Sequence, residues 1–213
     1  MPSGDSSIDF CYDFEQKRKL YFELRLLMQR AWISASIESQ LKAYNSYALE
    51  LGGEDQRNEV IRLQRLILEK CQDETGKPIK FREVNKGVYN FIVVNVSEIQ
   101  LTMFDRWDCF LATYGDAGVP FYFRLGIFGL FQQPSPGAPI AEEVFYSRFQ
   151  HFRETIHGVL FVRFGGHSNL EKLHIDRNLE YFLVWNNNLL GKEEMALIDL
   201  RLGSFLKKWS KRS

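Results

Sequence analysis

Apolar residues recur at intervals of three and four along the first fifty positions of the chain. The stripe consists of Phe14, Tyr21, Leu24, Met28, Ala31 and Ala35, widened by Leu20, Leu27 and Leu41. Because residues three and four positions apart lie on one face of a helix, this spacing predicts one long helix from about Phe10 to Leu51. The pair Gly52-Gly53 ends it, and a second apolar stripe from Val60 to Cys71 predicts an antiparallel partner helix.

A polar segment separates this helical hairpin from the rest of the chain. Residues 73–78 include Gly76 and Pro78, which are typical of a turn or linker. The expected domains are therefore an N-terminal helical hairpin over residues 1–75 and an α/β body over residues 76–213.

Within the body, apolar runs of strand length alternate with helical stripes. The predicted order is an edge strand at 79–84, strand 88–96, helix 97–114, strand 120–131, helix 139–158, strand 159–164, helix 168–175, strand 180–185 and helix 192–209. This alternation predicts an α/β or α+β fold, with the helical hairpin followed by a helix-covered sheet of four or five strands. Gly126 and Gly129 interrupt the second run, so a mostly antiparallel α+β layer is the alternative.

The charge balance gives no overall field that would attract an acidic partner. Lys plus Arg and Asp plus Glu both total 27, so neither nucleic acid nor an anionic membrane is favoured. Nucleic-acid binding stays a third hypothesis, which requires the basic stretches 17–19 and 207–212 to meet in space. Three widely spaced cysteines argue against a disulfide framework or a zinc ribbon. With no secretory signal pattern and no apolar run of about 20 residues, we expect a cytoplasmic protein with no membrane partner.

All four histidines fall between Pro139 and Asp176. His151, Glu154 and His157 have helical spacing, and imidazole with carboxylate is a common set of metal ligands. The core face of the same predicted helix consists of Phe145, Phe149, Phe152 and Ile156. That face turns the three candidate ligands toward solvent, so we expect a solvated polar face, without a metal or other cofactor.

A glycine pair follows the apolar run 159–164. Gly165, Gly166, His167, Ser168 and Asn169 are predicted to form a strand-to-helix turn, whose exposed amides could bind the phosphate of a small molecule or nucleotide. Simple helix capping is the structural alternative, because Ser168 and Glu171 form a capping box. A hydrolase reading, with Ser168 as nucleophile and His174 and Asp176 beside it, is disfavoured because Leu170 replaces a required glycine.

Polar, uncharged residues follow several predicted strands. They are Asn95, Ser97, Gln132, Gln133, the segment 165–169 and Asn186 to Asn188. If the strands are parallel, these ends form one rim that suits hydrogen bonding to a ligand or peptide better than acid/base chemistry. Asn186 is therefore added to the ligand-binding candidates at 165–169.

No motif for catalysis, metal binding or phosphate binding is complete in this sequence, so an enzyme is not the leading interpretation. The N-terminal stripe carries more aromatic residues than one helix needs. We therefore expect a non-catalytic binding or regulatory protein that associates with a protein partner, or with itself as a homo-oligomer, through residues 14–41. The alternative is an enzyme or sensor for a phosphorylated small molecule at Gly165 to Ser168.

Overall fold

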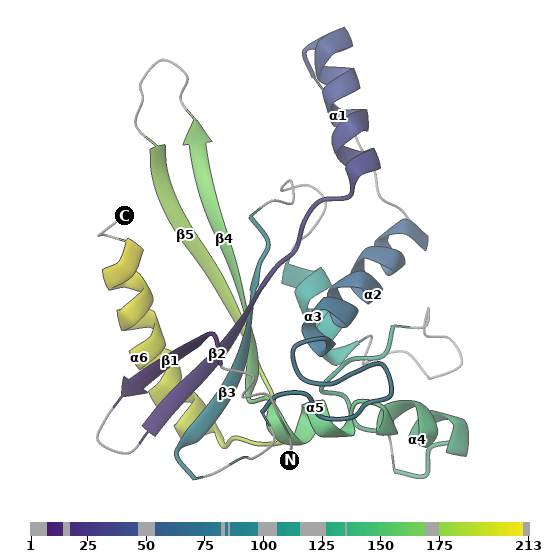
Figure 1. The fold of residues 1–213 in the computed structure, drawn as a ribbon, viewed down its shortest axis with the longest axis vertical. Helices are drawn as coiled ribbons and strands as arrows, with labels where there is room; N and C mark the ends of the chain where they lie inside the picture. The colour runs from purple at the N-terminus through teal and green to yellow at the C-terminus, as the bar shows by residue number, and fades with distance from the viewer. Residues whose placement is uncertain are drawn as a thin grey trace, which may run out of the picture.

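The computed structural model describes residues 8–14, 18–46, 54–81, 84, 86–97, 106–115, 127–134, 136–168 and 175–210. Figure 1 shows the arrangement of the helices and strands. The elements, in chain order, are β1 (Phe10–Phe14), β2 (Arg18–Leu26), α1 (Ala31–Tyr44), α2 (Glu54–Leu68), β3 (Val88–Asn95), α3 (Arg106–Tyr114), α4 (Ile140–Ser147), α5 (Gln150–Thr155), β4 (Gly158–Ser168), β5 (Ile175–Trp185) and α6 (Lys192–Ser210).

The strands form one mixed sheet in the order β1-β2-β3-β4-β5. The central pairs β2–β3 and β3–β4 are parallel, and the outer pairs β1–β2 and β4–β5 are antiparallel. The expectation of a mixed α/β fold with a helix-covered sheet of five strands is thus confirmed. Parallel pairing at the centre requires long crossovers, and helices α1 to α5 supply them.

The predicted long helix over residues 10–51 is wrong in its first half. Residues 10–14 and 18–26 are strands β1 and β2, and the helix covers only Ala31–Tyr44. Leu20, Phe22, Leu24 and Leu26 share one face of β2 at every second position, a strand period that the helical count concealed. Leu, Glu and Arg are good helix formers, so it is pairing with β1 and β3 that decides the conformation here.

The sheet separates two hydrophobic clusters. On one face, Leu20, Phe22, Phe91 and Leu160 pack with Ile198 and Leu202 of α6. The other face holds the larger cluster, with contributions from α1, α2, α3 and α5. The described helices of both parallel crossovers therefore cover the same face, and α6 is the described helix on the other, as Figure 1 shows.

Several predicted elements of the body differ from the structure. Residues 79–81 and 84 form no strand, although Pro78 makes an isolated bridge with Gln72. Of the predicted strand 120–131, the described part, 127–131, contains only a bridge from Phe128 to Gly115. The predicted helix 139–158 is two short helices, α4 and α5, and α6 confirms the last predicted helix. The boundary near residue 75 stays a prediction, while β2 and β3, on either side of it, share the sheet.

Candidate functional site

The segment Gly165 to Ser168 is the end of strand β4 and not a strand-to-helix turn. Gly165 pairs with Asn178, and Ser168 pairs with Ile175, in the antiparallel ribbon that β4 forms with β5. The prediction of a helix starting at Ser168 is therefore wrong, and the amide cluster of a helix start is not formed by the described residues. Asn169 and His174 lie outside the described residues. Beyond Val162 the described part of the ribbon is paired with no third strand, as Figure 1 shows.

His157 is buried, whereas the helical pattern predicted it to be solvent-exposed. Only 3% of its surface is exposed. Its Nδ1 atom accepts a hydrogen bond of 3.0 Å from the backbone N–H of Asn90, and its ring meets the ring of Tyr89 edge-on. The helix α5 ends at Thr155, two residues earlier than the histidine, so the helical spacing does not apply to it. Burial lowers the pKa of His157 to about 4, against the opposing effect of Glu194.

The other two metal candidates are engaged separately. His151 is half-buried, with Nδ1 within 3.2 Å of the Thr155 hydroxyl and Nε2 within 3.4 Å of the Lys80 carbonyl oxygen. Glu154 is exposed, as predicted, and accepts a hydrogen bond from Gln150. Among the described residues, no three His, Cys, Asp or Glu side chains come together in a way that could hold a metal ion.

The predicted polar rim is split between two ends of the sheet. Asn95 and Ser97 lie at the end of β3 that pairs with Val162, whereas Asn186 follows β5 at the opposite end, beside Gly158. Asn186 is fully buried, and its amide nitrogen donates to the carbonyl oxygens of Arg153 and Ile156. These bonds satisfy carbonyl groups at the end of α5, which gives Asn186 a structural task.

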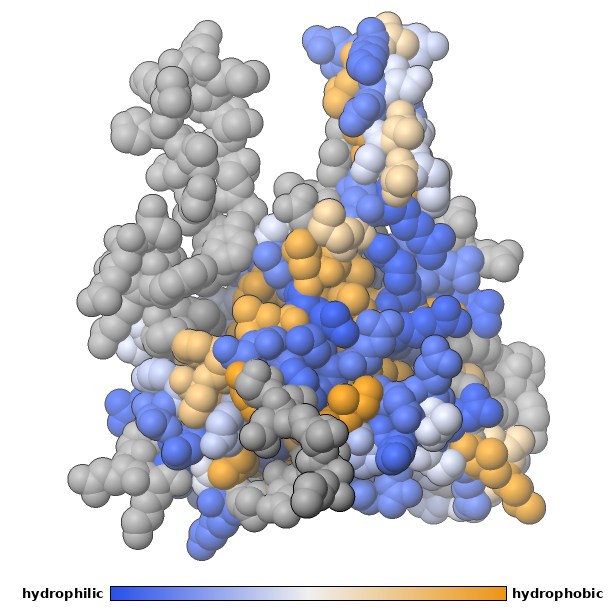
Figure 2. All heavy atoms as spheres, in the orientation of Figure 1, coloured by the Kyte–Doolittle hydropathy of each residue, from blue (hydrophilic) through white to orange (hydrophobic). Residues whose placement is uncertain are grey.

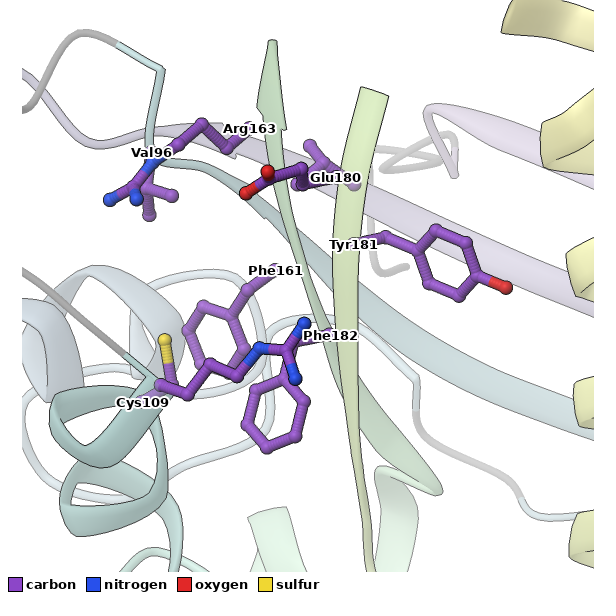
Figure 3. A pocket seen from close by; sticks show the side chains of 9 residues that line it. Val96, Cys109, Phe161, Arg163, Glu180, Tyr181 and Phe182 are labelled. Carbon is purple, nitrogen blue, oxygen red and sulfur yellow. The ribbon is translucent and has the colours of Figure 1, made fainter. Parts of the chain in front are cut away.

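A small pocket lies at the end of the sheet where β3 and β4 finish. Its polar lining comes from Arg106, Arg163 and Glu180, and its floor includes Cys109 and Phe182. In Figure 3 these labelled side chains of β4 and β5 lie on the α3 side of the ribbon, and Tyr181 points to the other side. The volume is about 60 Å³. That is room for a few waters, well below the roughly 300 Å³ of a small-molecule site.

The order and connections of the strands also give no larger crevice at this pocket. Doubly wound sheets bind ligands where consecutive crossovers move to opposite faces of the sheet. Here both crossovers lie on the same face, so β3 and β4 do not form such a switch point. The described residues that line this pocket include none of the predicted ligand-binding residues, Gly165 to Asn169 and Asn186, and the size of the pocket does not match a cofactor site.

A buried carboxylate with two lysines ties four chain segments together. Glu23 is fully buried on β2 and accepts hydrogen bonds from Lys70 at 2.9 Å and from Lys80 at 2.8 Å. Asp9 also accepts from Lys70, at 3.0 Å, and from the backbone N–H of Leu24 at 2.9 Å. This Asp9–Glu23–Lys70–Lys80 cluster was missed by the sequence reading, because the four residues are far apart in the chain.

The charges of two members of this cluster, Asp9 and Lys70, are stabilised and not poised for proton transfer. The Leu24 amide, with help from Lys70, lowers the pKa of Asp9 to about 2. Burial alone would lower the pKa of Lys70, but its hydrogen bonds to Glu23 and Asp9 outweigh burial and raise it. A catalytic lysine needs the opposite shift, so the cluster has the properties of a structural staple between β2 and the segment after α2.

A row of exposed apolar side chains runs along the second half of β2 and into α1. Leu24 is 50% exposed, Leu26 45%, Met28 54% and Trp32 47%. Leu41 and Tyr44 continue the apolar character along α1, and are also exposed. We call these six residues the β2–α1 surface. In Figure 2 apolar atoms gather in the middle of the visible face, where β2 runs toward α1.

The second half of β2 is exposed because the described part of α6 packs against the first half of the strand. Leu20 and Phe22 point to the same side of β2 as Leu24 and Leu26, but they are buried under α6. Among the described residues, the cluster under α6 does not include Leu24 or Leu26, and α1 projects from the body beyond them, as Figure 1 shows. The apolar pattern thus continues along the whole of β2, whereas the described residues bury this face only in the first half of the strand.

No family model, curated protein or solved structure matches this chain. No helix in the described part of the chain has the length and apolar character needed to cross a membrane.

Proposed function

We propose that this chain is a non-catalytic binding protein that acts by protein–protein association through the β2–α1 surface. The observation that carries the proposal is the set of half-exposed apolar side chains Leu24, Leu26, Met28 and Trp32, which come close together in the chain. Contiguous apolar patches are rare on monomeric proteins, and they mark interaction sites. Five of the six residues of this surface, all except Tyr44, lie within residues 14–41, which the sequence pattern indicated for association.

The chemistry of the polar groups supports the same interpretation. The pKa shifts of three groups described above oppose general acid–base catalysis, because they keep His157 neutral, Asp9 ionised and Lys70 protonated. The phosphate-binding alternative depended on a helix start at Ser168, where the structure has a strand. The basic stretches of the nucleic-acid hypothesis fall largely on residues outside the described part of the chain or without described side chains.

A photo-crosslinking amino acid at position 26 tests the proposal in cells that express the protein. The matched control is the same amino acid at Leu200, which is 70% exposed on α6, away from the β2–α1 surface. We expect a discrete crosslinked protein with the probe at position 26 and none at position 200. The adduct should disappear when Leu24→Asp is added. Equal labelling at both positions, or none at position 26, would contradict the proposal.

A further inference from the structure

The second half of β2 is an open sheet edge, although β2 lies inside the strand order. Strand β1 pairs with β2 only from Arg18 to Phe22, so Leu24 and Leu26 have no strand beside them among the described residues. The N–H groups of Lys19 and Leu27 donate to β3. Since hydrogen-bonding direction alternates along a strand, the backbone groups of the even-numbered residues point away from β3, toward the open edge.

The backbone groups on this edge are partly capped by side chains. The Leu24 N–H donates to Asp9 at 2.9 Å, and the Met28 carbonyl oxygen accepts from Arg62 at 2.7 Å. Four groups remain without a hydrogen-bond partner among the described residues: the Leu24 carbonyl, the Leu26 N–H and carbonyl, and the Met28 N–H. An exposed edge of this kind, flanked by apolar side chains, is a template for pairing with another strand.

These four groups are complementary to themselves. In an antiparallel pair centred on Leu26, the two copies of Leu26 exchange both of their backbone bonds. The Met28 N–H of each copy then reaches the Leu24 carbonyl of the other. The next two backbone groups along this edge are the Leu24 N–H and the Met28 carbonyl. They already bond to Asp9 and Arg62, so the pairing of two copies would not use them. Donors and acceptors therefore match in number and position under a two-fold rotation.

The side chains agree with this arrangement. Leu24, Leu26 and Met28 lie on one face, so the pairing places Leu26 beside its own copy and Leu24 beside Met28, which buries apolar surface that is exposed in one chain. Arg25, on the opposite face, forms an ion pair of 3.3 Å with Glu69, which offsets its charge near the symmetry axis. A two-fold axis requires such a self-complementary patch.

We infer that two copies of this chain associate by antiparallel pairing of β2 with β2, centred on Leu26, to form one sheet continuous across both copies. The inference rests on the proposed function and specifies its partner and geometry. A second copy is the expected partner, because the same segment rotated by half a turn matches the pattern of free and capped backbone groups on this edge.

Cysteine crosslinking tests the geometry. With the exposed Cys11 replaced by serine, Leu26→Cys places two thiols on Cα atoms about 5.5 Å apart across the axis, within the range of a disulfide. Leu24→Cys is the control, because its two copies would lie roughly 13 Å apart along the strands. We expect mild oxidation to give at least tenfold more covalent dimer with Leu26→Cys than with Leu24→Cys.

A second variant tests the backbone bonds. Leu26→Pro removes an N–H that has no partner among the residues that the structure describes, and a proline is tolerated on a strand edge. We expect this variant to keep its fold by circular dichroism and to be monomeric by light scattering, where wild type is a dimer. Monomeric wild type, or equal crosslinking at positions 24 and 26, would overturn the inference. If position 26 then captures a different protein in the photo-crosslinking experiment, the proposed function survives; if it captures nothing, both fail.

Discussion

The Nδ1 atom of His157 accepts a hydrogen bond of 3.0 Å from the backbone N–H of Asn90, and thereby links the start of β4 to the buried strand β3. The N–H of His157 donates in turn to the Asn90 carbonyl oxygen at 2.8 Å. The ring is therefore part of the sheet's hydrogen-bonding and cannot be removed without leaving a buried donor. Protonating or removing the His157 ring should therefore destabilise the protein.

Stability should fall as the pH decreases from about 6.5 to about 4. Burial lowers the pKa of His157 from 6.5 to about 4, so in this window the unfolded chain binds a proton that the folded chain does not. The loss should be on the order of 3 kcal/mol at the lower limit. Urea unfolding at a series of pH values measures it. In His157→Asn, whose amide oxygen can replace Nδ1 as acceptor, this part of the pH dependence should vanish.

The two histidines should differ strongly when each is replaced by alanine. His157→Ala leaves the Asn90 N–H without its acceptor and opens a cavity, so we expect a loss of about 2 to 4 kcal/mol in the free energy of unfolding. His151→Ala removes contacts of a half-buried side chain and should cost less, about 1 kcal/mol. The solvated polar face that the sequence predicted for His151, Glu154 and His157 is wrong for His157, which is buried. Similar losses for both variants would contradict this assignment.

Neutralising Glu23 should destabilise the protein severely. Glu23→Gln leaves Lys70 and Lys80 facing a neutral amide in a buried site, and breaking a buried ion pair from one side costs about 3 to 5 kcal/mol. The control is Asp13→Asn, which removes an exposed ion pair with Lys19 at 3.8 Å and should cost under about 1 kcal/mol. Chemical denaturation of both variants measures the difference, and a mild effect of Glu23→Gln would show that the cluster is not a staple.

Gly129 should not tolerate any side chain. A Cβ atom there would lie 2.1 Å from the backbone carbon of Tyr114 and 2.4 Å from the nitrogen of Gly115. The backbone of α3's last turn must therefore move in Gly129→Ala, and we expect a loss of about 3 kcal/mol or more. Gly191→Ala is the matched control, because a Cβ atom there meets nothing within 4 Å. A thermal melt of Gly129→Ala close to that of wild type would contradict the close contact.

The sequence predicted well those elements whose own pattern decides their structure. Strand β3 is mostly buried and was predicted as a continuous apolar strand rich in β-branched residues, and α6 has an apolar stripe at helical period with acids at its start. Strand β2 was misread because its Leu, Glu and Arg residues favour a helix, and only its neighbours in the sheet reveal it. Gly165-Gly166 was misread as a turn because glycine marks turns more often than it marks a ribbon.

The candidate surface was predicted in part. The sequence indicated residues 14–41 as apolar in excess, which remains the basis of the proposed association. It could not show that Glu23 lies buried between two lysines, or that the pairing of β1 with β2 ends at Phe22. Both facts depend on residues distant in the chain. Periodicity within one segment does not contain that information.

The order of the strands also has a consequence for the order of folding. The ribbon of β4 and β5 joins segments that are close in the chain, whereas β2 and β3 pair only after the chain from Leu26 to Val88 has closed into a loop. Loop closure of this length is entropically costly, and non-local pairing slows folding. We therefore expect the amides of β4 and β5 to become protected from hydrogen exchange before those of β3 when exchange is pulsed during refolding. The parallel centre of the sheet, which holds most of the core, would then be the last part to form, and the side of β2 that pairs with β3 would stay accessible to other chains until that step is complete.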